Sequence, residues 1–146
     1  MDRHELVRTW DEAWQAGLWA AAWPKALADL SGADAARQPA PGRHSIWQIL
    51  NHIVFWREVA VSRAGGGASP SDADVARRNF EAPVDHSDAA WKRALARFEE
   101  SQHAVRSAML DESKKLDSLA YLAPHDSYHI GQIMYVRALL GKPSIE

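Results

Sequence analysis

Apolar residues recur at helical spacing in four long stretches of this chain, and that periodicity constrains the fold more than any other feature. No stretch alternates apolar and polar residues for long enough to predict a β-strand, and no segment repeats another. The 146 residues suffice for one domain with its own core, residues 1–146. We therefore expect an all-α four-helix bundle with long helices near residues 3–16, 45–63, 87–110 and 120–140.

Local signals predict how these helices begin and how they are joined. Residues 17–42 are expected to form an irregular connection with one or two helical turns, because Pro39-Ala40-Pro41-Gly42 cannot lie inside a helix. Ser45 and Gln48 have the spacing of a capping box, which predicts a helix start at Ser45. Pro124 leaves two alternatives for the last helix, which either begins near this proline or begins earlier and is kinked there.

Two further features each have a structural and a functional interpretation. The seven tryptophans fit the core and rim of a helical bundle, or some of them line a ligand pocket or a subunit interface. The glycine run within residues 64–70 fits a flexible connection, or a mobile flap near a site. The structural interpretation is favoured for both.

Histidines near the end of the chain carry the most specific chemical signal. His125 and His129 are four residues apart in a segment expected to be helical, so both imidazoles project from one face. Such a pair can bind one metal ion, although it also occurs on solvated helix faces. The apolar character of the segment favours an inward-facing pair, because buried imidazoles need partners for their ring nitrogens. His52, in the apolar run of residues 46–56, is the expected third ligand.

Three neutral imidazoles on one ion leave at least one coordination position for water or substrate, as in catalytic zinc sites. His44 and His4 are reserve candidates for the ligand set. His44 lies about two turns from His52, too far along the helix axis for both to bind one ion. His86 and His103 are expected at the surface, since neither lies on an apolar stripe.

Charge and cysteine content exclude several classes of function. The formal net charge is −2 and the basic residues are scattered among acids, which argues against a nucleic-acid partner. The absence of cysteine excludes disulfides, thiolate ligands and a cysteine nucleophile. Because we find no targeting segment and no run of membrane-spanning length, we expect a cytoplasmic protein without a membrane partner.

Several motifs together carry a resemblance to a known family. Ser45-Ile46-Trp47 leads to His52, a long third helix follows, and the last helix contains His125-Asp126-Ser127-Tyr128-His129-Ile130-Gly131-Gln132-Ile133, followed by Leu139-Leu140-Gly141-Lys142-Pro143. With these motifs nearly the whole chain resembles the DinB/YfiT-like family of metal-dependent enzymes. The order and distances of His52, His125 and His129 match the three-histidine pattern of that family.

This resemblance implies an up-down-down-up four-helix bundle, one zinc- or nickel-like divalent ion on His52, His125 and His129, and frequent homodimers. It also implies thiol-dependent chemistry. Relatives with assigned chemistry join bacillithiol or similar low-molecular-weight thiols to electrophiles, or are mycothiol-dependent maleylpyruvate isomerases. The chain departs from the pattern at Pro124, directly before the first histidine of the pair, and this departure could alter the pocket that receives the substrate.

Three classes of function remain open. The first is an enzyme in which the metal lowers the pKa of a thiol cosubstrate and delivers the thiolate to a small electrophilic substrate. The second is a metal-dependent hydrolase whose nucleophile is a bound water. The third is a bundle that binds a metal or a small ligand without turnover. A three-histidine site has a net charge of +2 and no anionic ligand, which favours an incoming thiolate or carboxylate.

Other residues near the motif receive weaker assignments. Asp126 occupies the place of the glutamate base in a His-Glu-x-x-His motif, but its side chain is shorter, and solvation or capping is its more common role. Tyr128 is expected to pack rather than to act as an acid. Trp56, one turn from His52, could exclude water and hold the apolar part of an electrophile.

Overall fold

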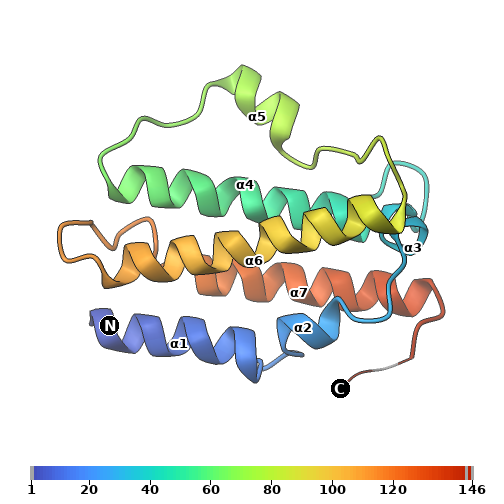
Figure 1. Ribbon diagram of the computed structural model, residues 1–146, viewed down its shortest axis with the longest axis horizontal. Coiled ribbons are helices and arrows are strands. Elements are labelled where there is room, and N and C mark those ends of the chain that lie inside the picture. Colours follow the sequence, from blue (N-terminus) through green and yellow to red (C-terminus); the bar gives the residue numbers. More distant parts are fainter. Residues whose placement is uncertain (1, 144, 146) are drawn as a thin grey trace.

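The computed structural model describes residues 2–143 and 145, and within them it contains seven helices and no strand (Figure 1). The four long helices are α1 (Arg3–Gln15), α4 (Ile46–Ala64), α6 (Asp88–Leu110) and α7 (Leu122–Leu139). The three short helices are α2 (Trp23–Ala26), α3 (Gly32–Ala36) and α5 (Asp72–Arg78). The expected all-α class is confirmed, and each long helix ends within about two residues of its predicted limits.

Side chains cap the starts of three long helices. Ser45 and Gln48 form the predicted capping box, in which the Ser45 hydroxyl accepts from the Gln48 N–H at 3.2 Å. Asp2 caps α1 and Ser87 caps α6 in the same way, by accepting a backbone N–H three residues ahead. Helix α7 has no side-chain cap, and Pro124 lies in its first turn, where a missing N–H breaks no helical bond. Of the two alternatives, the helix therefore begins near Pro124.

The connection between α1 and α4 is irregular as expected, with α2 and α3 as its two helical turns. Gly17, which follows the end of α1, has a φ of +71°, and a Cβ at this position would lie 2.0 Å from the Ala20 carbonyl oxygen. Only glycine fits this turn. Pro24 lies in the first turn of α2, and Ser31 caps α3.

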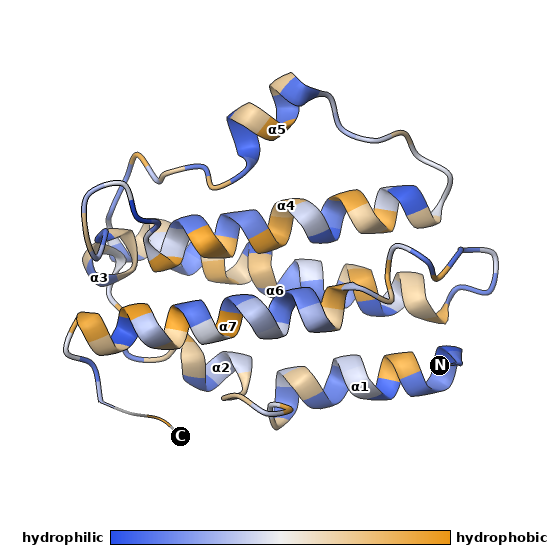
Figure 2. Cartoon of the chain, turned by 180° about the vertical axis from the view of Figure 1, so that it is seen from behind, coloured by the Kyte–Doolittle hydropathy of each residue, from blue (hydrophilic) through white to orange (hydrophobic). Residues whose placement is uncertain are grey.

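Helix α5 was not predicted from the sequence. Ser71 caps it, acidic residues occupy its first turn and basic residues its last turn, but none of its residues is buried. A seven-residue helix with no buried face leaves no apolar period to detect. In Figures 1 and 2 it lies outside the four long helices, in the segment that joins α4 to α6.

The four long helices lie side by side, with α4 packed against α6 and α7, and α1 packed against the same two helices (Figure 1). Their apolar faces form two clusters of buried side chains. The first cluster comprises Trp23, Ala26, Leu27, Leu30, Ala35, Ile46, Trp47, Ile49, Leu50, Ile53, Val54, Ala90, Trp91, Phe98, Ile130, Ile133 and Val136. The second cluster comprises Leu6, Val7, Trp10, Ala60, Ala64, Val105, Ala108, Met109, Leu119, Leu122 and Ala123.

Buried polar side chains separate the two clusters on three of the long helices. Arg57 of α4, Ser101 and Gln102 of α6, and Asp126 of α7 each lie between the residues that the helix contributes to one cluster and those it contributes to the other. We call these four residues the polar layer. None of the described helices combines the length and the apolar character that a membrane-spanning segment requires.

Candidate metal centre

Three histidines from two helices meet at one point on the bundle. His52 of α4 and His125 and His129 of α7 each offer a ring nitrogen, and these nitrogens all lie within 4.8 Å of one another. The Nε2 atoms of His52 and His125 are 3.1 Å apart. His52 and His129 are buried, and His125 is half-buried. The structure therefore brings together the three residues that the sequence singled out.

The Nδ1 atom of each ring faces an oxygen atom of a neighbouring side chain. The partner is Asn79 Oδ1 at 2.5 Å for His52, Asp126 Oδ1 at 3.0 Å for His125, and Gln132 Oε1 at 2.7 Å for His129. A ring that donates Nδ1–H to an oxygen leaves Nε2 as an unprotonated lone pair. Hydrogen bonds of this kind orient metal-binding histidines and fix their tautomer.

This tautomer makes the contact between His52 and His125 repulsive. With both Nδ1 atoms protonated, two Nε2 lone pairs face each other across 3.1 Å with no proton between them. A cation bound by both nitrogens removes the repulsion. Two nitrogens that bind one zinc ion at about 2.1 Å each lie at most about 4.2 Å apart. The 3.1 Å between His52 and His125 is within that limit, and the bound of 4.8 Å for all three nitrogens exceeds it by a few tenths of an ångström.

Burial keeps two of the rings neutral. Desolvation lowers the pKa of His52 to about 4, and the hydrogen bond with Asn79 opposes only part of this shift. Desolvation also lowers the pKa of His129. Since a histidine must be unprotonated to bind a metal, these two rings are in the ligating form at neutral pH.

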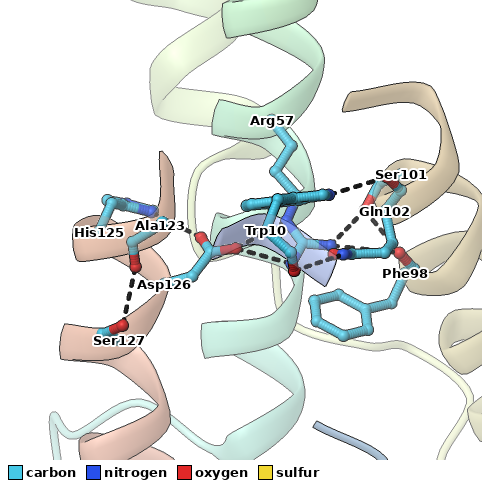
Figure 3. A network of polar contacts seen from close by, with 9 residues as sticks. All are labelled: Trp10, Arg57, Phe98, Ser101, Gln102, Ala123, His125, Asp126 and Ser127. Carbon is cyan, nitrogen blue, oxygen red and sulfur yellow. Dashed lines mark hydrogen bonds and ion pairs between the residues drawn. The ribbon is translucent and has the colours of Figure 1, made fainter. Parts of the chain in front are cut away.

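Asp126 ties His125 to the polar layer (Figure 3). Its Oδ2 atom accepts from Arg57 Nε at 2.9 Å and from Arg57 Nη2 at 2.7 Å, while Oδ1 faces His125. Arg57 also donates to Ser101 Oγ at 2.9 Å, and its guanidinium lies over the ring of Phe98. Burial lowers the pKa of the Arg57 guanidinium, and the attraction of the Asp126 carboxylate opposes that shift.

A pocket of about 530 Å³ opens beside the three rings. Trp56 lines it, as expected, with its ring centroid 6.5 Å from that of His52. Tyr128 is exposed and lines the same pocket, and Arg63 adds a cation to its wall. The full lining set in the described residues is His52, Trp56, Val59, Ala60, Arg63, Ser118, Tyr121, Leu122, His125, Tyr128 and His129, and it contains no carboxylate.

The segment after α5 supplies two residues that sequence reasoning missed. Asn79 orients His52, and the Phe80 ring stacks on His52 with centroids 4.0 Å apart. Gln48 and Asn51 of α4 hold this segment by donating to the carbonyl oxygens of Phe80 and Glu81. No periodic pattern marks these positions in the sequence.

Arg57 and Gln132 were missed as well, and the sequence did contain a signal for Arg57. Arg57 directly follows the apolar run of residues 46–56, and a cation buried in such a helix needs an anion. Asp126 is the one acid of α7.

The remaining histidines lie outside the cluster. The one metal-binding group found among the described residues contains neither His4 nor His44. His44 is exposed, and its ring stacks on Phe80 with centroids 3.9 Å apart. His86 and His103 are exposed, as predicted.

Neutral imidazole nitrogens are usual ligands of Zn²⁺ and Ni²⁺. The convergence of the three rings and the neutral form of His52 and His129 thus fit a divalent metal ion, which the histidine triad could hold.

Comparison with known proteins identifies a family. The family model of the DinB superfamily matches residues 17–133, a range that includes His52, His125 and His129. No curated protein and no solved structure shows a significant match to the chain. Because the matched range covers well over half of the sequence and contains the whole histidine cluster, the chain belongs to the DinB superfamily.

Proposed function

We propose that this protein is a metal-dependent transferase that joins a low-molecular-weight thiol to a small electrophilic substrate. His52, His125 and His129 would hold one Zn²⁺ or Ni²⁺ ion through their Nε2 atoms. The observation that carries the proposal is the convergence of these lone pairs at the wall of an open pocket. A bound divalent ion would lower the pKa of a coordinated thiol from about 8.5 toward 6 or 7, which raises the thiolate fraction at neutral pH about tenfold or more.

The charge of the site supports an anionic partner. The three ligands are neutral, so no protein anion would offset the charge of the ion. Arg63 adds a further positive charge to the pocket wall. Because the chain has no cysteine, the sulfur must arrive with a cosubstrate.

The apolar part of the pocket suits an electrophile of small size. Trp56, Val59 and Ala60 of α4 and Leu122 of α7 provide the apolar part of the pocket wall. Such a wall excludes water from the thiolate and holds the carbon atom to be attacked. Tyr128 places its ring edge-on to His129 with centroids 5.0 Å apart, next to the same space.

The hydrolase alternative has weaker support. A metal-bound water nucleophile is commonly paired with a carboxylate base, and none of the described residues that line the pocket is an acid. Asp126 is the nearest carboxylate in sequence, but it is buried and its oxygens face Arg57 and His125. These contacts suit a positioning role for Asp126 better than that of a general base. Binding without turnover stays the third alternative.

The bundle topology belongs to the same proposal. We infer the up-down-down-up order that the family resemblance implies. In Figure 1, the colours of α1 and α7 advance from left to right, whereas those of α4 and α6 advance from right to left, which supports this order.

A conjugation assay tests the proposed function. Metal-loaded protein is incubated with bacillithiol, mycothiol or glutathione and a chlorodinitrobenzene-type electrophile, and the rate of thioether formation is measured. We expect His125→Ala to lower the rate to the uncatalysed level with the accepted thiol, because one ligand is lost. The exposed His103→Ala should keep the full rate and serves as the control. Equal rates for His125→Ala and the unsubstituted chain with every thiol would reject the transferase.

A further inference from the structure

Helix α7 has an outer face without a charged residue. The structure describes the whole helix, and its two formally charged residues, Asp126 and Arg137, are both buried. By contrast, α1 and α6 each expose several acids and bases. A helix with no charge on the side away from its own core is typical of a helix that another surface covers. The exposed residues of α7 are Pro124, Ser127, Tyr128, Gly131, Tyr135, Ala138 and Leu139.

The residues of this outer face repeat every seven positions in two series. One series consists of tyrosines, and the other consists of compact residues three positions after each tyrosine. Their stripe has the a and d spacing of helices that pack side by side. Tyr121, directly before the helix, already has helical dihedral angles and extends the stripe. The tyrosines are Tyr121, Tyr128 and Tyr135, and the compact residues are Pro124, Gly131 and Ala138.

The compact residues leave free space between the tyrosines. A Cβ atom at Gly131 would meet no atom within 4 Å. A pocket of about 710 Å³ opens at the same place, and Tyr128, Gly131, Tyr135 and Leu139 contribute to its lining. A large side chain from another surface therefore fits beside Gly131.

We propose that two copies of this chain pair through this face, with their α7 helices antiparallel about a two-fold axis. In an antiparallel pair, each tyrosine faces a compact residue of the other copy, whereas a parallel pair would set tyrosine against tyrosine and leave gaps between. The face is its own complement, as a two-fold interface requires. An axis midway between residues 129 and 130 aligns Tyr121 with Ala138, Tyr128 with Gly131, and Tyr135 with Pro124 of the second copy.

The area of this face suffices for a stable pair. Tyr121, Tyr128 and Tyr135 are between 66 % and 75 % exposed, and Leu139 is 54 % exposed. At about 150–250 Å² for each fully covered aromatic side chain, the three tyrosines offer roughly 300–500 Å² per copy. With Leu139 and the compact residues, two copies would bury roughly 1,000 Å², the size from which specific interfaces are stable.

The second copy would complete the wall of the pocket beside the three histidines. Tyr121 and Tyr128 line that pocket. In the antiparallel pair they would lie against Ala138 and Gly131 of the second copy, so the pocket of one copy would be bordered by α7 of the other. The pairing uses none of the three histidines and does not depend on the proposed chemistry.

Sedimentation velocity of the full-length chain measures the pairing. We expect twice the mass of 16.2 kDa for the unsubstituted chain. Gly131→Phe should yield a monomer, because its ring takes the space of Tyr128 from the second copy, whereas a Cβ at this position touches nothing in its own chain. Tyr135→Lys should also yield a monomer, because the pair would bury a charge that is solvated in the single chain.

Two controls should remain dimeric. Ala96→Phe adds the same ring to the exposed face of α6. His52→Ala/His129→Ala removes two of the proposed metal ligands, and a dimer in this variant separates the pairing from the metal centre. Circular dichroism of each variant shows that it is folded.

Cysteine cross-linking tests the direction of the two helices, because the chain has no cysteine of its own. An oxidised mixture of Tyr121→Cys and Ala138→Cys copies should give a disulfide-linked dimer. Tyr121→Cys alone should give none, since its two copies would lie roughly 25 Å apart along the paired helices.

Four results would each overturn the proposal. They are a monomeric unsubstituted chain, a dimer that persists in folded Gly131→Phe and Tyr135→Lys variants, and a disulfide between two Tyr121→Cys copies. The fourth is binding of a monomer to phosphatidylcholine vesicles that Tyr135→Lys abolishes, which would assign the face to a membrane surface.

Discussion

The orientation of each imidazole depends on one neighbouring oxygen atom, and the three oxygens come from three different parts of the chain. Asn79 lies after α5, whereas Asp126 and Gln132 lie one and three residues from the histidines that they orient. Only Asp126 is itself charged, and it is held by a buried cation. Asp126 is therefore the residue whose substitution should affect both the metal centre and the stability of the protein.

Asp126→Asn should lower both the metal affinity and the free energy of unfolding. The amide keeps the size of the side chain but leaves Arg57 as a buried cation without an anion, which typically costs about 3–5 kcal/mol. Loss of the carboxylate partner of a metal-binding histidine typically lowers metal affinity by about 10–100-fold. Urea unfolding and zinc calorimetry measure the two effects.

Two comparisons make the Asp126 result specific. Asp117→Asn, on the surface just before α7, should change neither quantity. The double variant Arg57→Met/Asp126→Leu should recover much of the stability, because an apolar pair replaces the ion pair, while the metal affinity stays low. A single Asp126→Asn variant as stable as the unsubstituted chain would contradict the prediction.

The metal-free protein should lose stability as the pH falls from about 6.5 to about 4. In the unfolded chain His52 has its ordinary pKa of 6.5, whereas burial lowers its pKa in the folded protein to about 4. The unfolded state therefore takes up the proton first, and the free energy of unfolding falls across this interval. His52→Gln should flatten the pH dependence measured by urea unfolding, and His103→Gln should not. Identical pH profiles for the three proteins would show that His52 is not buried as a neutral ring.

Among the secondary-structure elements, α4 and α7 provide the histidines and the segment of residues 79–81 fixes one of them. This segment has no regular structure, yet Gln48 and Asn51 hold it on α4 and Phe80 covers His52. Phe80 has a φ of +55°, a conformation that residues other than glycine rarely adopt. Such strain is retained where the surrounding contacts determine the conformation.

Asn79→Ala should lower the zinc affinity by about tenfold, because the acceptor for the His52 Nδ1–H is lost. Asn51→Ala is the matched control, since it loosens the same segment without removing that acceptor. Competition with a chromophoric chelator measures both affinities. Asn79→Asp, which keeps an oxygen in place, should restore most of the affinity. An equal loss in Asn51→Ala and Asn79→Ala would mean that the segment acts through its position alone.

The features that could be predicted from the sequence are those that depend on periodic patterns and on local helix caps. The four long helices follow from their apolar stripes, the start of α4 follows from Ser45 and Gln48, and the histidine pair follows from the period of one helix. Contacts between distant segments leave no such pattern. Asn79 reaches His52 across 27 positions and Arg57 reaches Asp126 across 69, and neither distance in sequence is set by a local rule. Trp47 and Trp91 lie in the core, as the favoured interpretation predicts, and Trp14 and Trp56 line pockets. Contact of a tryptophan with a ligand stays a prediction.

For the whole molecule, metal binding should stabilise the fold, because the ligands come from α4 and α7 and the unfolded chain holds no preformed site. Free zinc at about 100 times its dissociation constant should add about 2.7 kcal/mol, which corresponds to a rise of roughly 5–10 °C in the melting temperature. Differential scanning calorimetry with and without a chelator measures this rise. His103→Ala should show the full rise and His52→Ala/His129→Ala none. A similar rise in the double variant would place the ion elsewhere. The homodimer implied by the family resemblance stays a prediction.

The polar layer has a consequence for how the bundle assembles. A slip of α7 by one turn, about 5.4 Å along α4, would set Arg57 against an apolar neighbour and leave Asp126 in the wrong layer. Such a shift would lower the stability of the bundle, because Arg57 would lose its ion pair with Asp126. It would also disturb the metal centre, because His125 would lose the Asp126 oxygen that orients its ring. Metal binding would then favour the correct alignment of α7 on α4, because a bundle with a shifted α7 could not hold the ion.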